Sequence, residues 1–275
     1  MGNDDRKKDE QYQIAGYTMR ERRQIPKDQF KDFHAFLKMI KKDFRDFSIV
    51  EGQFRSRSND MYSIVEAHFD CLDQVDFVLA DIKSVAKELS SLSLRKAYIT
   101  VEVAEEFVTF SDQKNAVPFR TLSPEYSDNP FIPPDQMKDI WEETIDFESP
   151  LIREELSGAF VSRIYKMSRK FALRGVVMRH KSGNLNKGNI HIDEEGNGLQ
   201  PCHISMKLNS TFLTPIKQGG FILIPSVLYI FNKSDVVFEV YLCKGHNTVA
   251  ITHKAKVGKL SVTSYCRSSY LTESP

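Results

Sequence analysis

From residue 159 onward the chain is a dense run of short segments that favour strands, and this run limits the folds that the chain can adopt. The segments are rich in β-branched and aromatic residues, and Gly, Asn, Asp and Ser lie in the breaks between them. Strands at this spacing predict an antiparallel β-sandwich or barrel. No long helical pattern separates them, which argues against a parallel βαβ sheet. The segments are Phe160–Met167, Phe171–His180, Cys202–Leu208, Thr211–Ile216, Phe221–Phe231, Val236–Cys243, Thr248–His253 and Leu260–Cys266.

The first part of the chain has a different periodicity. Two stretches place apolar residues at alternating intervals of three and four, which puts each set on one face of a helix. Between them, Ile49–Phe54 and Met61–Phe69 resemble a hairpin, and Ala97–Val103 is a further strand candidate. The two apolar sets are Phe30, Phe33, Leu37, Ile40, Phe44 and Phe47, and then Leu72, Val75, Leu79, Ile82, Ala86 and Leu89.

A proline-rich stretch joins these two parts. Five prolines fall between Ser111 and Pro134, which predicts an irregular connection. An acidic helix should begin at Pro134, because proline is tolerated in a first helical turn. A second, short helix is expected at Leu151–Leu156, with Gly158 ending it.

We therefore expect an α+β fold, with a helix-rich N-terminal part on a small sheet and a C-terminal antiparallel β-sandwich or barrel. The expected units are a flexible polar arm (1–24), an α+β unit (25–110), the proline-rich connection with its acidic helix (111–158), an all-β sandwich-like domain (159–268) and a tail (269–275).

Composition sets further bounds on the chain. Its 275 residues are 41% hydrophobic and 27% charged, which excludes global disorder, and its net charge of +1 gives no whole-protein field. The N-terminus lacks an apolar signal segment, and the longest apolar run contains Pro225. We expect a cytoplasmic protein whose four cysteines are free thiols.

No sequence motif fixes a chemistry. Phosphate-binding loops, nucleophile elbows and metalloprotease motifs are missing from the sequence. Cys243 and His246 have the spacing of one zinc-ligand pair, but the adjacent Cys202 and His203 would face opposite sides of a strand. We expect no metal, no cofactor and no small-molecule ligand. A hydrolase or transferase with a Cys/His site assembled in space is the alternative.

The strongest functional pattern is the segregation of charge. A basic stretch follows residue 162 with no acid in it, whereas acids outnumber bases between Glu102 and Glu155. Basic side chains with interleaved aromatics suit nucleic-acid or other anionic partners. The stretch could instead be a solvated face, or pair internally with acids such as Glu154 and Glu155. Its basic residues are Arg163, Lys166, Arg169, Lys170, Arg174, Arg179 and Lys181.

The sequence thus predicts a non-enzymatic structural or interaction protein. We expect it to bind a protein partner or to self-assemble, with contact to a nucleic acid such as RNA through the basic stretch. Attachment of the same basic stretch to an anionic membrane surface is a less favoured expectation. Helices joined to a β-sandwich are similar in outline to viral matrix and movement proteins, although no motif in the chain supports a family resemblance.

Overall fold

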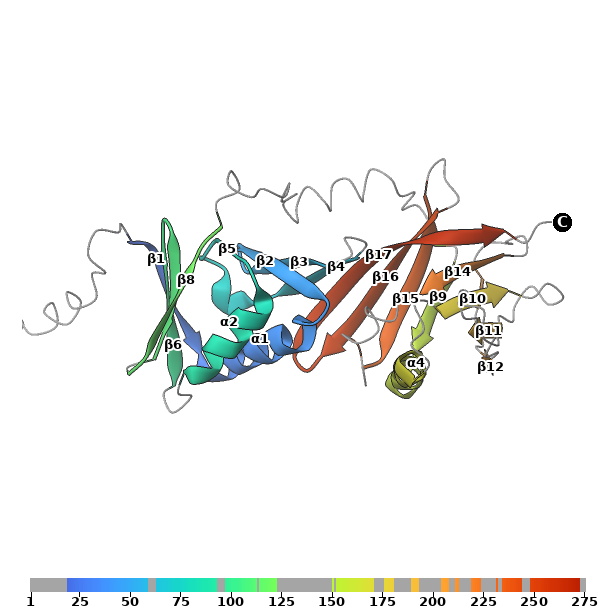
Figure 1. Ribbon diagram of the computed structural model, residues 1–275, viewed down its shortest axis with the longest axis horizontal. Coiled ribbons are helices and arrows are strands. Elements are labelled where there is room, and N and C mark those ends of the chain that lie inside the picture. The colour runs from blue at the N-terminus through green and yellow to red at the C-terminus, as the bar shows by residue number, and fades with distance from the viewer. Residues whose placement is uncertain are drawn as a thin grey trace, which may run out of the picture.

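The computed structural model shows an elongated molecule built mainly of antiparallel strands (Figure 1). No helix in the part of the chain that it describes is long and apolar enough to cross a membrane. The described residues are 19–58, 63–92, 97–112, 114–122, 150, 152–170, 176–180, 189–192, 204–207, 211–212, 219–223, 231, 234–243 and 248–272.

The N-terminal half combines two helices with eight strands. Its helices are α1 (Lys27–Ile40) and α2 (Ile82–Glu88), and short 3₁₀ turns lie at η1 (Asp70–Leu72) and η2 (Leu89–Ser91). The strands are β1 (Met19–Pro26), β2 (Phe44–Val50), β3 (Gln53–Ser58), β4 (Ser63–His68), β5 (Phe77–Leu79), β6 (Tyr98–Ala104), β7 (Phe107–Ser111) and β8 (Ala116–Arg120).

The C-terminal half contains nine strands and one described helix, α4 (Gly158–Lys170). Its strands are β9 (Ile152–Leu156), β10 (Val176–His180), β11 (Asn189–Ile192), β12 (Ile204–Lys207), β13 (Thr211–Phe212), β14 (Gly219–Leu223), β15 (Val236–Leu242), β16 (Thr248–Val257) and β17 (Leu260–Thr272).

One long sheet runs through both halves. Its eleven strands follow the order β13-β9-β15-β16-β17-β4-β3-β2-β5, with β14 attached to β17 and β10 to β14. The halves join where β17 pairs antiparallel with β4, with Val262 opposite Ala67 and Cys266 opposite Ser63. A separate four-stranded sheet has the order β1-β6-β7-β8, and β11 pairs with β12.

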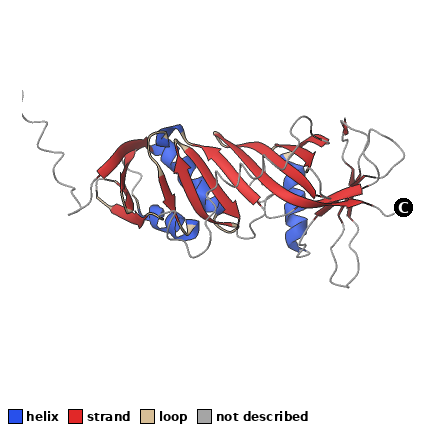
Figure 2. Ribbon diagram, turned by 90° about the horizontal axis from the view of Figure 1, so that it is seen from above, coloured by secondary structure: helices blue, strands red, loops and turns tan. Residues whose placement is uncertain are grey.

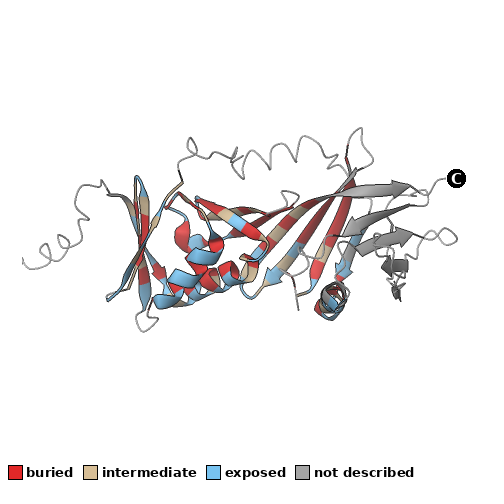
Figure 3. Cartoon of the chain, in the orientation of Figure 1, coloured by how far each residue is buried: buried red, intermediate tan, exposed pale blue. Residues whose placement is uncertain are grey.

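The three helices in the described part of the chain, α1, α2 and α4, lie on one side of the long sheet. They are below it in Figure 1, and Figure 2, seen from above, shows strands in front of them. Helix α1 packs against both sheets, because the ring of Phe33 lies 6.3 Å from that of Phe47 on β2 and 6.2 Å from that of Phe110 on β7. Figure 3 shows buried residues along the strands and along the inner faces of the helices.

The expected fold class is wrong. The N-terminal half is not helix-rich, because eight strands accompany its two helices. The C-terminal half is not a closed sandwich, because its strands continue the sheet of the N-terminal half. The positions of the predicted unit boundaries remain predictions, although β1 begins at Met19, inside the segment expected to be an arm.

Two segments have the opposite structure to the one expected. Phe160–Met167, predicted as a strand, lies within α4, and Leu151–Leu156, predicted as a helix, contains β9. Gly158 begins α4 instead of ending a helix. The predicted acidic helix after Pro134 lies outside the described residues.

The expectations for α1 and for several strands hold in part. The first apolar set forms the buried face of α1 as far as Ile40, while Phe44 and Phe47 continue into β2. Strands occur where Ala97–Val103 and the segments from Val236 to Cys266 predicted them.

Candidate nucleic-acid interface

Helix α4 begins at a cap that the sequence supplies locally. The amide of Phe160 donates to Ser157 Oγ at 3.3 Å, and the amide of Val161 donates to the Ser157 carbonyl at 3.0 Å. These bonds satisfy amides that a helix start leaves unpaired. The amide of Gly158 donates to Asp235 Oδ1 at 2.7 Å, which fixes the start of α4 to the segment that leads into β15.

The two faces of α4 differ sharply. Val161 and Ile164 are fully buried, whereas Arg163, Lys166 and Lys170 are exposed. Residues separated by three and four positions lie on one helical face, so the three cations share a face. The helix contains no Asp or Glu, so this face is uniformly basic.

The structure brings together only part of the predicted basic stretch. Arg169 is on α4 and Arg179 is on β10, but their side chains lie outside the described residues, as do Arg174 and Lys181 altogether. No ion pair joins Arg163 to any other described side chain, and the same is true of Lys166. Within the described part, the expectation of internal pairing therefore finds no support for these two cations.

Helix α1 presents a second, mixed face on the same side of the sheet. Lys31 and Lys38 are exposed on it, seven residues apart, with Ala35 between them. Asp28 lies 3.4 Å from Lys31 Nζ and offsets part of its charge. Lys83 and Lys87 on α2 are also exposed. The sequence pattern did not assign these lysines to binding, although Lys31 and Lys38 fall outside the apolar repeat of α1.

The opposite face of the long sheet has its buried carboxylates neutralised. Glu239 on β15 accepts hydrogen bonds from Lys254 Nζ at 3.0 Å, Tyr241 Oη at 3.1 Å and Thr252 Oγ1 at 3.3 Å. Burial alone would raise the pKa of the Glu239 carboxyl, but these donors, with the charge of Lys254, hold the pKa below its ordinary value. The negative charge of Glu239 is therefore compensated by its own hydrogen-bond donors on this face.

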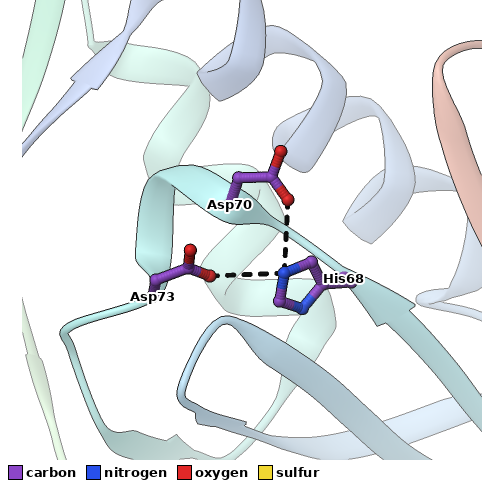
Figure 4. A group of neighbouring side chains, drawn as sticks. All are labelled: His68, Asp70 and Asp73. Carbon is purple, nitrogen blue, oxygen red and sulfur yellow. Dashed lines mark ion pairs between the residues drawn. The ribbon is translucent and has the colours of Figure 1, made fainter.

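One exposed group combines metal-ligand side-chain types. His68 Nε2 lies 3.2 Å from Asp70 Oδ1 and 3.3 Å from Asp73 Oδ1, at the end of β4 (Figure 4). It is the only such trio among the residues that the structure describes. The Asp70 side chain is 84% exposed, so water competes for it, and the His68 ring itself occupies the point where the carboxylates converge. We assign this trio as a surface ion-pair group that the sequence did not single out.

The Cys/His alternative gains no support from the described residues. Cys71, Cys243 and Cys266 are buried and form no disulfide within the described part of the chain, and burial raises the pKa of the Cys71 thiol to about 11, which keeps it protonated and inert. Ser264 and His253 are hydrogen-bonded at 3.3 Å but are fully buried. His246, which has zinc-ligand spacing from Cys243 in the sequence, lies outside the described residues.

Comparisons with known proteins give the fold and nothing more specific. No protein-family model and no curated protein matches the sequence. The structure is similar to a putative DNA polymerase III beta subunit from Eubacterium rectale, with 11% identity, a TM-score of 0.59, and coverage of 91% of this chain and 66% of that one. A chain of the PCNA2-PCNA3 complex from Sulfolobus tokodaii is 8% identical, with a TM-score of 0.52 and coverage of 90% and 99%.

A third similar structure is the Helicobacter pylori beta clamp bound to a DNA ligase peptide. It is 12% identical, with a TM-score of 0.53 and coverage of 93% of this chain and 68% of that chain. Together these likenesses show a sliding-clamp-like fold, which replaces the expected helical front and β-sandwich. They give no support to the viral outline or to a preference for RNA.

Proposed function

We propose that this chain is a non-enzymatic, clamp-type subunit that binds protein partners and contacts the backbone of DNA through the basic faces of α4 and α1. The observation behind the proposal is the exposed, acid-free face of α4 formed by Arg163, Lys166 and Lys170. Lysine and arginine neutralise phosphates whatever the base sequence, so the contact is sequence-independent. The proteins of similar fold, a polymerase subunit and a clamp bound to a ligase peptide, favour DNA as the nucleic acid.

The shape of the molecule supports assembly into a larger structure. The long sheet lies on one side of the elongated molecule, and the described helices α1, α2 and α4 lie on the other (Figure 1). Copies joined end to end in a closed curve would put the sheets outside and the basic helix faces inside. The similar Sulfolobus tokodaii chain comes from a complex of PCNA2 with PCNA3. The partner here is a second copy of the chain or a related chain.

DNA binding measured across a salt series tests the proposed contact. The variant combines Arg163→Gln and Lys166→Gln, which remove charge from α4 without altering its buried face. The matched control combines Lys256→Gln and Lys259→Gln, two exposed lysines of β16 and its turn. We expect the α4 variant to bind more weakly and its salt slope to fall by about 2, because each lost phosphate contact removes roughly 0.9.

The control variant should retain both the affinity and the salt slope of the unmodified chain. Equal losses in the two variants would show only a dependence on total charge and would overturn the assignment to α4. A mass measurement in solution, by sedimentation or light scattering, tests assembly separately. A monomer at every concentration, with and without DNA, would contradict self-assembly.

A further inference from the structure

The side chain of His253 occupies an unusual position in the core of the C-terminal half. It projects from β16, is 0% exposed, and has its ring centroid 5.7 Å from that of Phe231 and 5.3 Å from that of Phe238. Its Nδ1 is hydrogen-bonded to Ser264 Oγ at 3.3 Å. Its Nε2 is buried and has no hydrogen-bond partner among the described residues. A buried polar atom without a hydrogen-bond partner destabilises the folded state, so its presence here suggests a function.

No described charge is placed to compensate a protonated His253. Alternation along the strands puts Val236, Phe238 and Val240 of β15, and Val262, Ser264 and Cys266 of β17, on the same face as His253. Glu239 and Lys254 neighbour this site in the strands but lie on the other face. Glu154 on β9 is in register with Phe238, one strand further away, and its side chain lies outside the described residues.

The same core includes the buried residues of α4. Val161 and Ile164 belong to the hydrophobic cluster that includes Phe231, Phe238 and Ile251. This cluster continues into the N-terminal half, and β15 and β16 supply Phe238 and Ile251 to it. Opening these strands therefore removes apolar surface from the cluster to which the buried face of α4 belongs.

We propose that His253 is an acid-sensitive latch, whose protonation opens the strands β15–β17 and loosens α4 while the N-terminal half stays folded. The closed core accepts only the neutral ring, because the proton on Nε2 would find no acceptor and the charge no partner. The open strands expose the ring to water, where it takes a proton at its ordinary pKa.

The direction of the effect follows from linkage. Burial lowers the pKa of His253 from 6.5 to about 3. The open state therefore binds more protons than the closed state between these two values. The latch is fully closed above pH 6.5, and each pH unit below that favours opening by up to about tenfold.

The buried histidine of the N-terminal half differs in its bonding. The ring nitrogen Nε2 of His34 on α1 donates to the carbonyl of Ala86 on α2 at 2.8 Å. Protonation leaves that bond intact and His34 is 9% exposed, so acid destabilises this half less than the core around His253. The two halves should thus open at different pH.

Two buried cysteines report on the two halves within one molecule. Cys266 lies on β17 and is 0% exposed, and Cys71 lies on η1 in the N-terminal half and is 8% exposed. We would label the chain with an aromatic disulfide that reacts at acidic pH, and measure each site by peptide mass spectrometry. Both labelling rates fall with pH, because less thiolate is present in the opened chain at lower pH. Dividing the Cys266 rate by the Cys71 rate removes this shared effect and leaves the difference in opening between the two halves.

The expected result is a rise in this ratio, by up to about tenfold per pH unit below pH 6.5. His253→Gln and His253→Leu, two replacements that cannot titrate, should each abolish the rise; either one suffices if the other does not fold. His34→Gln should preserve or steepen it, because it removes the effect of His34 protonation on the half that carries Cys71. A constant ratio, or a rise that survives both replacements of His253, would overturn the proposal. The test needs no DNA, so its outcome is independent of the proposed function.

Discussion

Tyr265 on β17 donates a hydrogen bond from its hydroxyl to Glu66 Oε2 on β4, at 3.1 Å, across the seam that joins the two halves. Arg55 Nε, on β3, donates to the other oxygen of Glu66 at 2.8 Å. The Glu66 side chain is only 8% exposed, so its two donors replace the water that burial removed. The backbone ladder between β4 and β17 is thus reinforced by a side-chain network on the face without helices.

The first prediction concerns this network. Tyr265→Phe should lower the free energy of unfolding by about 1 kcal/mol, the usual loss for one hydrogen bond. Arg55→Met should cost more, about 3 kcal/mol, because it leaves a buried carboxylate without its cation. Urea unfolding measures both values. Losses of equal size in the two variants would contradict the role given to the Arg55 charge.

The second prediction concerns the turn between β2 and β3. Glu51 has φ +47° and Gly52 has φ +72°, and Val50 pairs with Gln53 around them, so both central residues of this two-residue turn are left-handed. Glycine and asparagine adopt such a backbone at low cost, but glutamate does not. Glu51→Asn should therefore stabilise the chain by about 0.5–1 kcal/mol in thermal or urea unfolding.

Gly52 is the matched position in the same turn. A Cβ there would lie 2.2 Å from Asp73 Oδ1 and 2.9 Å from the Phe69 carbonyl oxygen. Gly52→Ala should therefore destabilise the chain, in the opposite direction to Glu51→Asn. A neutral Gly52→Ala would show that η1 moves away from the turn at little cost.

Helix α1 was predictable because one signal governs it. Its apolar residues repeat with the helical period, and Pro26 marks its start. The second apolar set has the same spacing, and all six of its residues are buried. Yet five of these residues are divided among η1, β5, α2 and η2, and Val75 lies between η1 and β5. Asp81 adopts a left-handed conformation and starts a new helix by accepting a hydrogen bond from the Ser84 amide. Periodic burial does not require one continuous helix.

Helix α4 was missed because its composition favours strands. The segment contains Phe160, Val161, Ile164 and Tyr165, which are common in strands, but the cap at Ser157 overrides this preference. The sequence did contain a signal for a helix: Ser157 can cap a helix start, and the apolar residues Val161 and Ile164 that follow it are three positions apart. The β4–β17 pairing joins residues about two hundred positions apart, and nothing in a single sequence marks such a partner. The basic stretch was therefore found, but its placement on a helix was not.

The third prediction separates the two lysines of the α1 face. Lys38→Gln should weaken DNA binding and lower the salt slope by roughly 0.9, the value for one phosphate contact. Lys31→Gln should have a smaller effect, because Asp28 at 3.4 Å already offsets its charge. Asp28→Asn should strengthen binding, for the same reason. Fluorescence anisotropy over a salt series measures all three. A larger loss for Lys31→Gln than for Lys38→Gln would contradict this ranking.

The last prediction concerns the contact between α1 and α2 as the pH falls. Burial lowers the pKa of His34, the bond to the Ala86 carbonyl opposes this, and the nearby charges of Lys38 and Lys41 lower the pKa further. The pKa in the folded chain is thus below the value of 6.5 expected in the unfolded chain. The unfolded chain therefore binds more protons below pH 6.5, and the stabilisation is complete above that pH and is lost as the pH falls.

His34→Gln keeps a donor for the Ala86 carbonyl but removes the titration. We expect it to cost about 1 kcal/mol or less at neutral pH, the scale of one imperfect hydrogen bond. Its free energy of unfolding should then fall less steeply with acid than that of the unmodified chain, by at most about 1.4 kcal/mol per pH unit. Lys38→Gln should act in the same direction but more weakly, since it removes one charge that lowers the pKa of His34. Urea unfolding at several pH values measures these slopes, and parallel slopes for His34→Gln and the unmodified chain would show that His34 does not titrate on unfolding.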